Sequence, residues 1–172
     1  MKLLRKHVRL SGYDYSTPGA YFVTTCTDHM RCLFGEISNG TALLNDCGII
    51  ARECWEEIPQ HFIGTEIDIF QVMPNHVHGV LLLSEHRHKL GNIVGPYKAA
   101  VTRRIRSLPG FSKVRVWEIS FHEHIIRKQD SLERVREYIV NNPMKWELDR
   151  YHPSREDAED DDDWSEIVGD ES

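Results

Sequence analysis

The sequence has no hydrophobic run long enough to cross a membrane. Hydrophobic residues make up 40% of its 172 residues and charged residues 28%, which is ordinary for a water-soluble domain. No run approaches the roughly 20 apolar residues that a membrane helix needs. The basic first residues, Met1 to Lys6, also lack the apolar stretch of a signal peptide. We therefore expect a cytoplasmic protein with no membrane partner.

Cysteine is scarce, and its spacing argues against zinc ribbons and disulfide frameworks. Cys26, Cys32, Cys47 and Cys54 lie in the first third of the chain and form no CxxC pair. A chain of this length can bury a core without disulfides or a structural metal. We expect one globular unit whose thiols are reduced and mostly buried.

The chain has no surplus of positive charge, because its net charge is -6. This would argue against a nucleic-acid partner, but the acidic residues are concentrated at one end of the chain. Ten of them, with one basic residue, fall between Arg155 and Ser172, so the first 154 residues hold 20 basic and 17 acidic side chains. The acidic run repels itself and has little apolar surface to order it. We predict a mildly basic domain over residues 1–154 and a disordered acidic tail over residues 155–172.

Hydrophobic periodicity and turn residues predict alternating strands and helices. Asn39-Gly40 favours a hairpin turn, Pro59 should stop the first long helix, and Asp130 with Glu133 is typical of a capping box. The Gly-rich phosphate loops of doubly wound folds are missing, so we predict a compact α+β sandwich with an antiparallel sheet. The expected strands cover residues 21–26, 32–36, 41–44, 66–72 and 76–83, with one or two more in 114–126, and the expected helices cover 46–58, 90–107 and 131–141.

Two histidines interrupt the apolar strand predicted over residues 76–83. Side chains two residues apart point to the same face of a strand, so His76 and His78 can share one ion. In the last predicted helix, Tyr138 and Asn142 are one turn apart and lie on one face. If that helix packs across the strand, two nitrogens and an amide oxygen could hold a cation and leave positions open for a phosphate oxygen and water, as in a catalytic site.

A tyrosine beside such an ion indicates nucleophilic chemistry on a phosphodiester. A phenol with a pKa near ~10 attacks poorly at neutral pH, but metal coordination and neutralised phosphate charge lower the barrier. The product is a phosphotyrosine, an ester that keeps the energy of the broken backbone bond. A released 3′ hydroxyl can later reverse the attack, so strands can be exchanged without ATP.

Each of these residues also has a plain structural interpretation. Most His-x-His pairs in strands are packing or surface residues, a helical tyrosine usually belongs to a core or interface, and Asn-Asn-Pro often ends a helix. His86 and His88 fall in a polar segment that we expect to be a solvated loop. His122 and His124 share one face of a strand, where a surface position or a supporting role is expected rather than metal ligation.

Longer motifs resemble the REP-associated tyrosine transposases, a branch of the single-tyrosine HUH transposases. The similarity rests on Val72-Met73-Pro74-Asn75-His76-Val77-His78 and, roughly sixty residues on, Glu137-Tyr138-Ile139-Val140-Asn141-Asn142-Pro143-Met144-Lys145-Trp146. It extends to nearly everything before the acidic tail. The further similar segments are Tyr13 to Tyr15, Gly19 to Thr24, Leu33 to Gly35, Trp117, and His124 to Arg127.

The resemblance implies a ferredoxin-like fold with a central antiparallel sheet and helices packed on it. It also implies that Tyr138 is the nucleophile, that His76 and His78 bind the metal, and that Asn142 is the third ligand. The metal in this family is usually Mg²⁺ or Mn²⁺. The substrate is single-stranded DNA with imperfect hairpins from repetitive extragenic palindromes, which the enzyme nicks and rejoins through a 5′-phosphotyrosine. The acidic tail lies outside the shared pattern.

Basic side chains could steer and hold the DNA backbone, although each is equally compatible with a solvated surface. Whether the protein is a monomer or a homodimer stays open. The candidate DNA contacts are Lys2, Arg5, Lys6 and Arg9 in an N-terminal arm, Lys98, Arg103 and Arg104 in the long helix, and Arg127 and Lys128 before the last helix.

Two other functions fit part of the pattern. A domesticated regulator that binds hairpin DNA, with weak or no cleavage, is the first alternative, although nothing in the sequence favours the loss of cleavage. A histidine-triad nucleotide hydrolase also carries alternating histidines in a strand. That motif needs a third histidine where Val80 stands, and its nucleophile is a histidine rather than a tyrosine.

Overall fold

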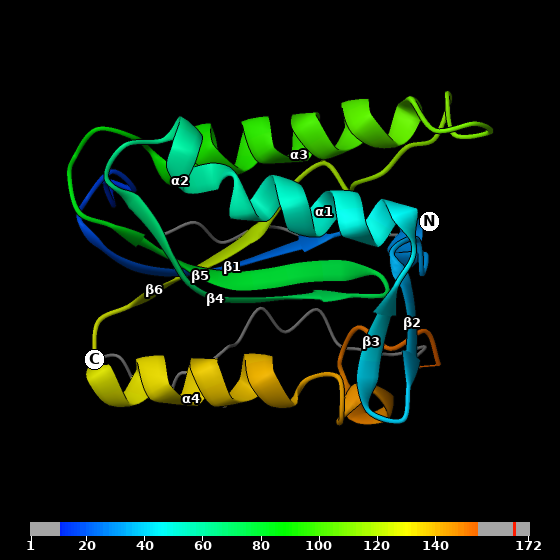
Figure 1. Cartoon of the computed structure of the whole chain (residues 1–172). Helices are drawn as coiled ribbons and strands as arrows, with labels where there is room; N and C mark the ends of the chain where they lie inside the picture. The colour runs from blue at the N-terminus through cyan, green and yellow to red at the C-terminus, as the bar shows by residue number, and fades with distance from the viewer. Residues whose placement is uncertain (1–10, 155–166, 168–172) are drawn as a thin grey trace.

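The computed structural model describes residues 11–154 and Ile167 (Figure 1). The predicted arm with Lys2, Arg5, Lys6 and Arg9 lies outside the described residues, as does the predicted acidic tail apart from Ile167. Four antiparallel strands form the central sheet in the order β4-β5-β1-β6. They are β1 (Gly19–Cys26), β4 (Thr65–Met73), β5 (His76–Leu83) and β6 (His122–Ile126).

Two helical crossovers give this sheet a ferredoxin-like topology. The chain runs β1-α1-β4-β5-α3-β6, and α1 (Asp46–Glu56) and α3 (Leu90–Arg106) lie on one face of the sheet with the short α2 (Ile58–His61) (Figure 1). Helix α4 (Gln129–Asn141) covers the opposite face. The predicted α+β sandwich with a central antiparallel sheet is confirmed.

Alternation along the strands divides the buried side chains between two cores. On the α1/α3 face, the ring of Trp55 stacks on that of Phe70 with centroids 5.8 Å apart. A Cβ atom at Gly79 would come within 2.8 Å of the Trp55 ring, so only glycine fits beneath the indole. On the α4 face, Phe22 and Val80 pack against the helix.

A bulge in β4 helps to fix α4 over the sheet. The register shifts between Ile67 and Ile69, which places these two residues on opposite faces, whereas simple strand alternation would place both on one face. Asp68, between them, accepts two hydrogen bonds from the Arg136 guanidinium of α4, at 2.8 and 2.6 Å. This bidentate pair ties the helix that carries Tyr138 to the edge strand.

The region between β1 and β4 follows its turn and capping signals. The hairpin of β2 (Gly35–Ser38) and β3 (Thr41–Leu44) turns at Asn39 and Gly40, whose φ angles are 49° and 70°. Asn45 caps α1 by accepting a hydrogen bond from the Gly48 backbone at 3.0 Å. Pro59 lies in the first turn of α2, where its missing N–H is not needed, and α1 ends earlier than predicted.

The second half of the chain departs from prediction at one helix start. Helix α4 begins at Gln129, and among the described residues no side chain caps it, so the predicted capping box of Asp130 and Glu133 is wrong. Asp130 lies in the first turn instead, where its charge favours the helix dipole. Residues 114–126 contain a single named strand, β6. No helix in the described part of the chain is long and apolar enough to cross a membrane.

Candidate active site

Strand β5 delivers both histidines to the α4 face of the sheet, as alternation predicts. The rings of His76 and His78 are 4.8 Å apart with their planes at 74°, and both residues are 0% exposed. Within the described residues, Nε2 of His76 and both ring nitrogens of His78 have no hydrogen-bond partner. Buried polar atoms are nearly always hydrogen-bonded, so three such atoms side by side indicate a ligand-binding centre.

Asn75 determines which nitrogen of His76 faces this centre. Its Nδ2 donates to the carbonyls of Met30 and Tyr151, at 3.2 and 2.7 Å, so its Oδ1 is the acceptor for Nδ1 of His76 at 2.9 Å. His76 therefore carries its proton on Nδ1 and presents a lone pair on Nε2. Metal-binding imidazoles are held in the same way, through their other nitrogen. Spacing along the chain could not indicate this role, because both carbonyls are far away in sequence.

Burial keeps both imidazoles neutral. It lowers the pKa of His76 from 6.5 to about 3, and the nearby Asn142 side chain partly opposes this shift. Burial also lowers the pKa of His78 well below its ordinary value; repulsion between the two imidazoles in their protonated forms adds to the shift, and Asp149 opposes it. Neutral imidazoles offer the lone pairs that a divalent cation requires.

Helix α4 brings Tyr138 to the histidines. The ring centroids of Tyr138 and His78 are 5.4 Å apart, Phe22 packs edge-on against the phenol at 6.2 Å, and the hydroxyl oxygen is buried. Burial raises the pKa of Tyr138 well above its ordinary value, with a further rise from Asp149 and an opposing effect of Arg150. The phenol is thus protonated at neutral pH and needs activation to serve as a nucleophile.

Asn142 follows one turn later, at the end of α4, and completes the arrangement. It is 2% exposed, and its Nδ2 donates a hydrogen bond to Asp149. Its Oδ1 is buried and has no hydrogen-bond partner among the described residues. The structure therefore brings together the four residues singled out from the sequence, which are His76, His78, Tyr138 and Asn142.

These buried atoms fit a divalent cation with open coordination positions. Two imidazole nitrogens and one amide oxygen leave room for a substrate oxygen and water. Over the residues that the structure describes, no group of three or more His, Cys, Asp or Glu side chains could hold a metal ion. A cation bound here would therefore depend on Asn142 for its third protein ligand.

Comparison with known proteins agrees with this geometry. Residues 29–142 match the family described as "Transposase IS200 like". The chain belongs to this family. A relative from Haemophilus influenzae, described as an uncharacterized protein, is 36% identical in an alignment 169 positions long that covers 86% of this chain and 93% of the relative. A REP-associated tyrosine transposase solved with a bound REP hairpin shares the fold, with a TM-score of 0.60 and 20% identity over 85% of this chain and 74% of that one.

The pocket beside Tyr138 is lined by three basic side chains and by the acidic Glu137 and Asp149. Its volume is about 390 Å³, and Asn142 also lines it. Its basic lining residues, Arg134, Lys145 and Arg150, come from α4 and from the segment that follows it. Such side chains attract phosphate groups. Sequence reasoning did not single them out, because they form a cluster only after the chain turns back at the end of α4.

His122 is a further buried polar residue on the face that carries the histidine pair. On the α4 face, His78 lies opposite Thr24 of β1, and Thr24 lies opposite His122 of β6. Two strand spacings, roughly 10 Å, therefore separate the backbones of the two histidines. His124 lies opposite Phe22 on the same face. The supporting role of His122 and His124 stays a prediction.

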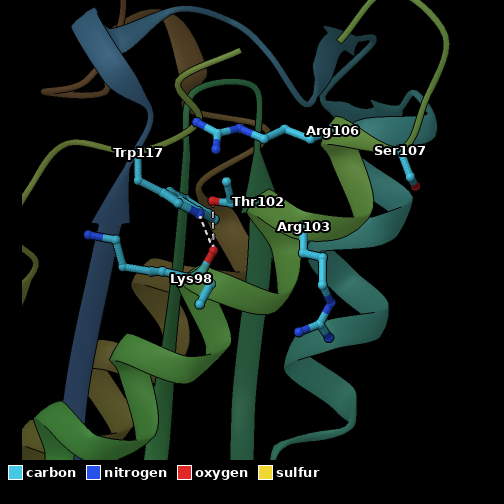
Figure 2. A pocket seen from close by; sticks show the side chains of 7 residues that line it. Lys98, Thr102, Arg103, Arg106, Ser107 and Trp117 are labelled. Carbon is cyan, nitrogen blue, oxygen red and sulfur yellow. Dashed lines mark hydrogen bonds between the residues drawn. The ribbon is translucent and has the colours of Figure 1, made fainter. Parts of the chain in front are cut away.

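The predicted DNA contacts on α3 differ in how their side chains are engaged. The Lys98 ammonium donates to the backbone carbonyls of residues 118–120, at 2.7 to 3.3 Å, and burial lowers its pKa to about 8. Arg104 pairs with both carboxylate oxygens of Glu57, at 3.0 and 2.6 Å. Arg103 is exposed and extends away from Lys98 along the open pocket at the end of α3 (Figure 2).

The remaining described candidates lie next to α4. Arg127 and Lys128 are exposed immediately before the helix begins, whereas the candidates on α3 lie across the sheet from Tyr138 (Figure 1). DNA contacts by all of these residues stay predictions. The other histidine pair, His86 and His88, lies in the loop between β5 and α3.

Proposed function

We propose that this chain is a metal-dependent endonuclease and strand transferase for single-stranded DNA, acting at palindromic repeat hairpins. The observation that carries the proposal is the position of the Tyr138 ring, 5.4 Å from that of His78. Beside it lie the ring nitrogens and the amide oxygen that lack hydrogen-bond partners within the described residues. Membership of the IS200-like transposase family agrees with this chemistry.

In the proposed reaction the Tyr138 oxygen attacks the scissile phosphorus, and the bond from phosphorus to the 3′ oxygen breaks. The phenol loses its proton, the 3′ oxygen gains one, and the 5′ end stays attached as a phosphotyrosine. A bound Mg²⁺ or Mn²⁺, held by His76, His78 and Asn142, would neutralise phosphate charge and favour the phenolate. Attack by a 3′ hydroxyl on the phosphotyrosine reverses the step and joins two strands.

The surrounding side chains support this reaction in two ways. Helix α4 is held in place by Phe22 and by the ion pair between Arg136 and Asp68, so that the Tyr138 phenol lies over the face of the sheet that carries His76 and His78. The basic lining of the pocket would attract the scissile phosphate, and the burial of the phenol oxygen would exclude water that could hydrolyse the phosphotyrosine. One set of side chains would therefore position the phenol, and the buried pocket around it would protect the phosphotyrosine from water.

The proposed substrate has two supports. A REP-associated tyrosine transposase with the same fold was solved bound to a REP hairpin. In addition, the first 154 residues of this chain carry 20 basic against 17 acidic side chains, and a positive domain suits the phosphate backbone. We therefore propose single-stranded DNA that carries an imperfect hairpin next to the cleavage site.

Cleavage of labelled hairpin oligonucleotides by the full chain, with Mg²⁺ or Mn²⁺, tests the proposal. We expect a covalent 5′-phosphotyrosine at residue 138, detected by denaturing gel and peptide mass spectrometry, and loss of at least about a thousandfold in rate for Tyr138→Phe. Tyr97→Phe is the matched control, because it removes a hydroxyl that donates to the Ala51 carbonyl on the other face of the sheet.

The same assay separates the alternatives. If wild type and Tyr138→Phe bind hairpins equally well and neither cleaves them, the protein is a hairpin-binding regulator. If the covalent adduct forms on a histidine, the nucleotide hydrolase is correct and the transposase chemistry is wrong. Loss of cleavage in Tyr97→Phe at unchanged folding would show that the Tyr138 result is not specific to the site.

A further inference from the structure

Asp149 lies beside the candidate site, and the reaction above assigns no role to it. It follows a 3-10 turn, η2 (Trp146–Leu148), and is 5% exposed. Both of its carboxylate oxygens are engaged: Oδ2 accepts a hydrogen bond from Nδ2 of Asn142, and Oδ1 accepts one from the Tyr151 backbone N–H at 2.7 Å. A buried carboxylate needs such donors to replace its hydration.

We propose that Asp149 is a positioning residue that turns the Asn142 amide so that its oxygen, rather than its NH₂ group, faces the metal centre. The inference rests on the proposed function, because it assigns a role toward the metal. A carboxylate accepts hydrogen bonds, so the amide group that meets it is the NH₂. The amide oxygen of Asn142 then points away from Asp149, and the Asn142 side chain lies near that of His76.

A path of hydrogen bonds links Asp149 to the opposite side of the same centre. The Tyr151 carbonyl accepts from Nδ2 of Asn75 at 2.7 Å, and Oδ1 of Asn75 holds Nδ1 of His76 at 2.9 Å. The path therefore runs from Asn142 through Asp149, Tyr151 and Asn75 to His76. One candidate ligand lies at each end, and the side chain next to each ligand determines which of its atoms faces the centre.

The carboxylate also places negative charge within reach of the site. Asp149 acts on both Tyr138 and His78 through its charge. In a buried environment a nearby negative charge favours a bound cation, and partners that orient a metal ligand typically contribute about ten- to a hundredfold in affinity. The orientation that Asp149 gives to Asn142 and the negative charge of Asp149 would therefore both increase the affinity for a cation.

Mn²⁺ binding to the DNA-free full chain, measured by electron paramagnetic resonance, tests the role of Asp149 apart from catalysis. In Asp149→Asn, the Tyr151 N–H keeps the new amide oxygen in place, so the new NH₂ faces Asn142. Asn142 must then turn and present its own NH₂ to the centre. We expect Mn²⁺ affinity to fall by about ten- to a hundredfold.

Exchanging the two residues provides the decisive variant. In the double variant Asn142→Asp with Asp149→Asn, the NH₂ at position 149 donates to one carboxylate oxygen at position 142, and the other oxygen faces the metal. Net charge is unchanged. We expect Mn²⁺ affinity to return to within about threefold of wild type, and Mn²⁺-dependent hairpin cleavage to recover with it. If Asp149 served folding alone, folded Asp149→Asn would keep wild-type Mn²⁺ affinity.

His78→Ala separates failure of this inference from failure of the proposed function. The role of Asp149 is overturned if folded Asp149→Asn keeps wild-type Mn²⁺ affinity, or if a folded exchange variant shows no recovery. In either case the proposed metal centre still stands, provided that His78→Ala no longer binds Mn²⁺. Wild-type Mn²⁺ binding that persists in His78→Ala overturns the centre itself. Circular dichroism and thermal unfolding verify the fold of each variant, and if Asp149→Asn alone fails to fold, the exchange variant decides.

Discussion

The two faces of the central sheet share their strands but differ in what covers them and in what they leave unsatisfied. Under α1 and α3, rings such as those of Trp55 and Phe70 stack in a large apolar cluster, in which the Trp55 indole N–H is also buried without a hydrogen-bond partner among the described residues. Under α4, two fully buried histidines and Thr24 present polar atoms that have no hydrogen-bond partner among the described residues. Strand alternation thus places most apolar side chains under α1 and α3 and the candidate ligand-binding residues under α4.

Truncating a side chain on the apolar face should give the largest change in stability. Leu81 is 0% exposed in the core under α1 and α3, so Leu81→Ala is expected to lower the free energy of unfolding by about 2 to 5 kcal/mol, measured by urea denaturation. Cleavage per folded molecule should stay near wild type, because Leu81 lies across the sheet from Tyr138. A large loss of that specific activity would show that the two faces are not independent.

Lowering the pH should reduce the free energy of unfolding of the metal-free protein, because His76 is buried as a neutral imidazole. The pKa of His76 is lowered from 6.5 to about 3, so at pH 5 the unfolded chain takes up a proton that the folded protein does not. The stabilisation is complete above pH 6.5 and is lost as the pH falls toward the folded pKa. We expect about 2 kcal/mol less stability at pH 5 than at pH 7 from this histidine, measured by urea unfolding in EDTA.

His76→Gln is the control for this pH dependence, because glutamine does not titrate in this range. Its stability should fall less steeply between pH 7 and pH 5 than that of the wild type. Parallel curves for the two proteins would contradict a neutral, buried imidazole at this position.

Replacing a histidine by an apolar ring should have the smallest effect on stability and the opposite sign. His78→Phe removes two buried nitrogens that lack partners in the described structure and keeps a ring in the same space. We expect the metal-free protein to gain about 1 to 2 kcal/mol, seen as a higher melting temperature in EDTA. The variant should also lose any stabilisation by Mn²⁺. A lower melting temperature in EDTA with an unchanged Mn²⁺ response would make His78 a structural residue.

Local periodicity was enough to predict which site residues share a face. The two-residue spacing of His76 and His78, and the four-residue spacing of Tyr138 and Asn142, follow from strand and helix geometry alone. Whether the two pairs meet depends on long-range packing. Residue spacing alone did not predict that packing, and the expectation came from the family resemblance. The structure places the rings of Tyr138 and His78 5.4 Å apart.

Features that depend on a distant partner could not be predicted from spacing. The bulge at Asp68 is defined by its register with β5 and by its pairing with Arg136. Asn75 and Tyr151 are 76 positions apart, so no local pattern indicates their hydrogen bond. The cap expected at Asp130 is absent because α4 begins earlier, directly after Lys128. At the bulge, the strand register and the ion pair with Arg136 prevail over simple alternation.

The hydrogen-bonded path from Asn142 to His76 joins the end of α4 to the turn before β5. On the proposed chemistry, a tyrosine attached to a DNA end could swing to a distant acceptor only if that path broke. If the path stays intact during the proposed reaction, the acceptor strand has to travel to the tyrosine. Strand exchange by this protein would then be a rearrangement of the nucleic acid around a fixed protein centre.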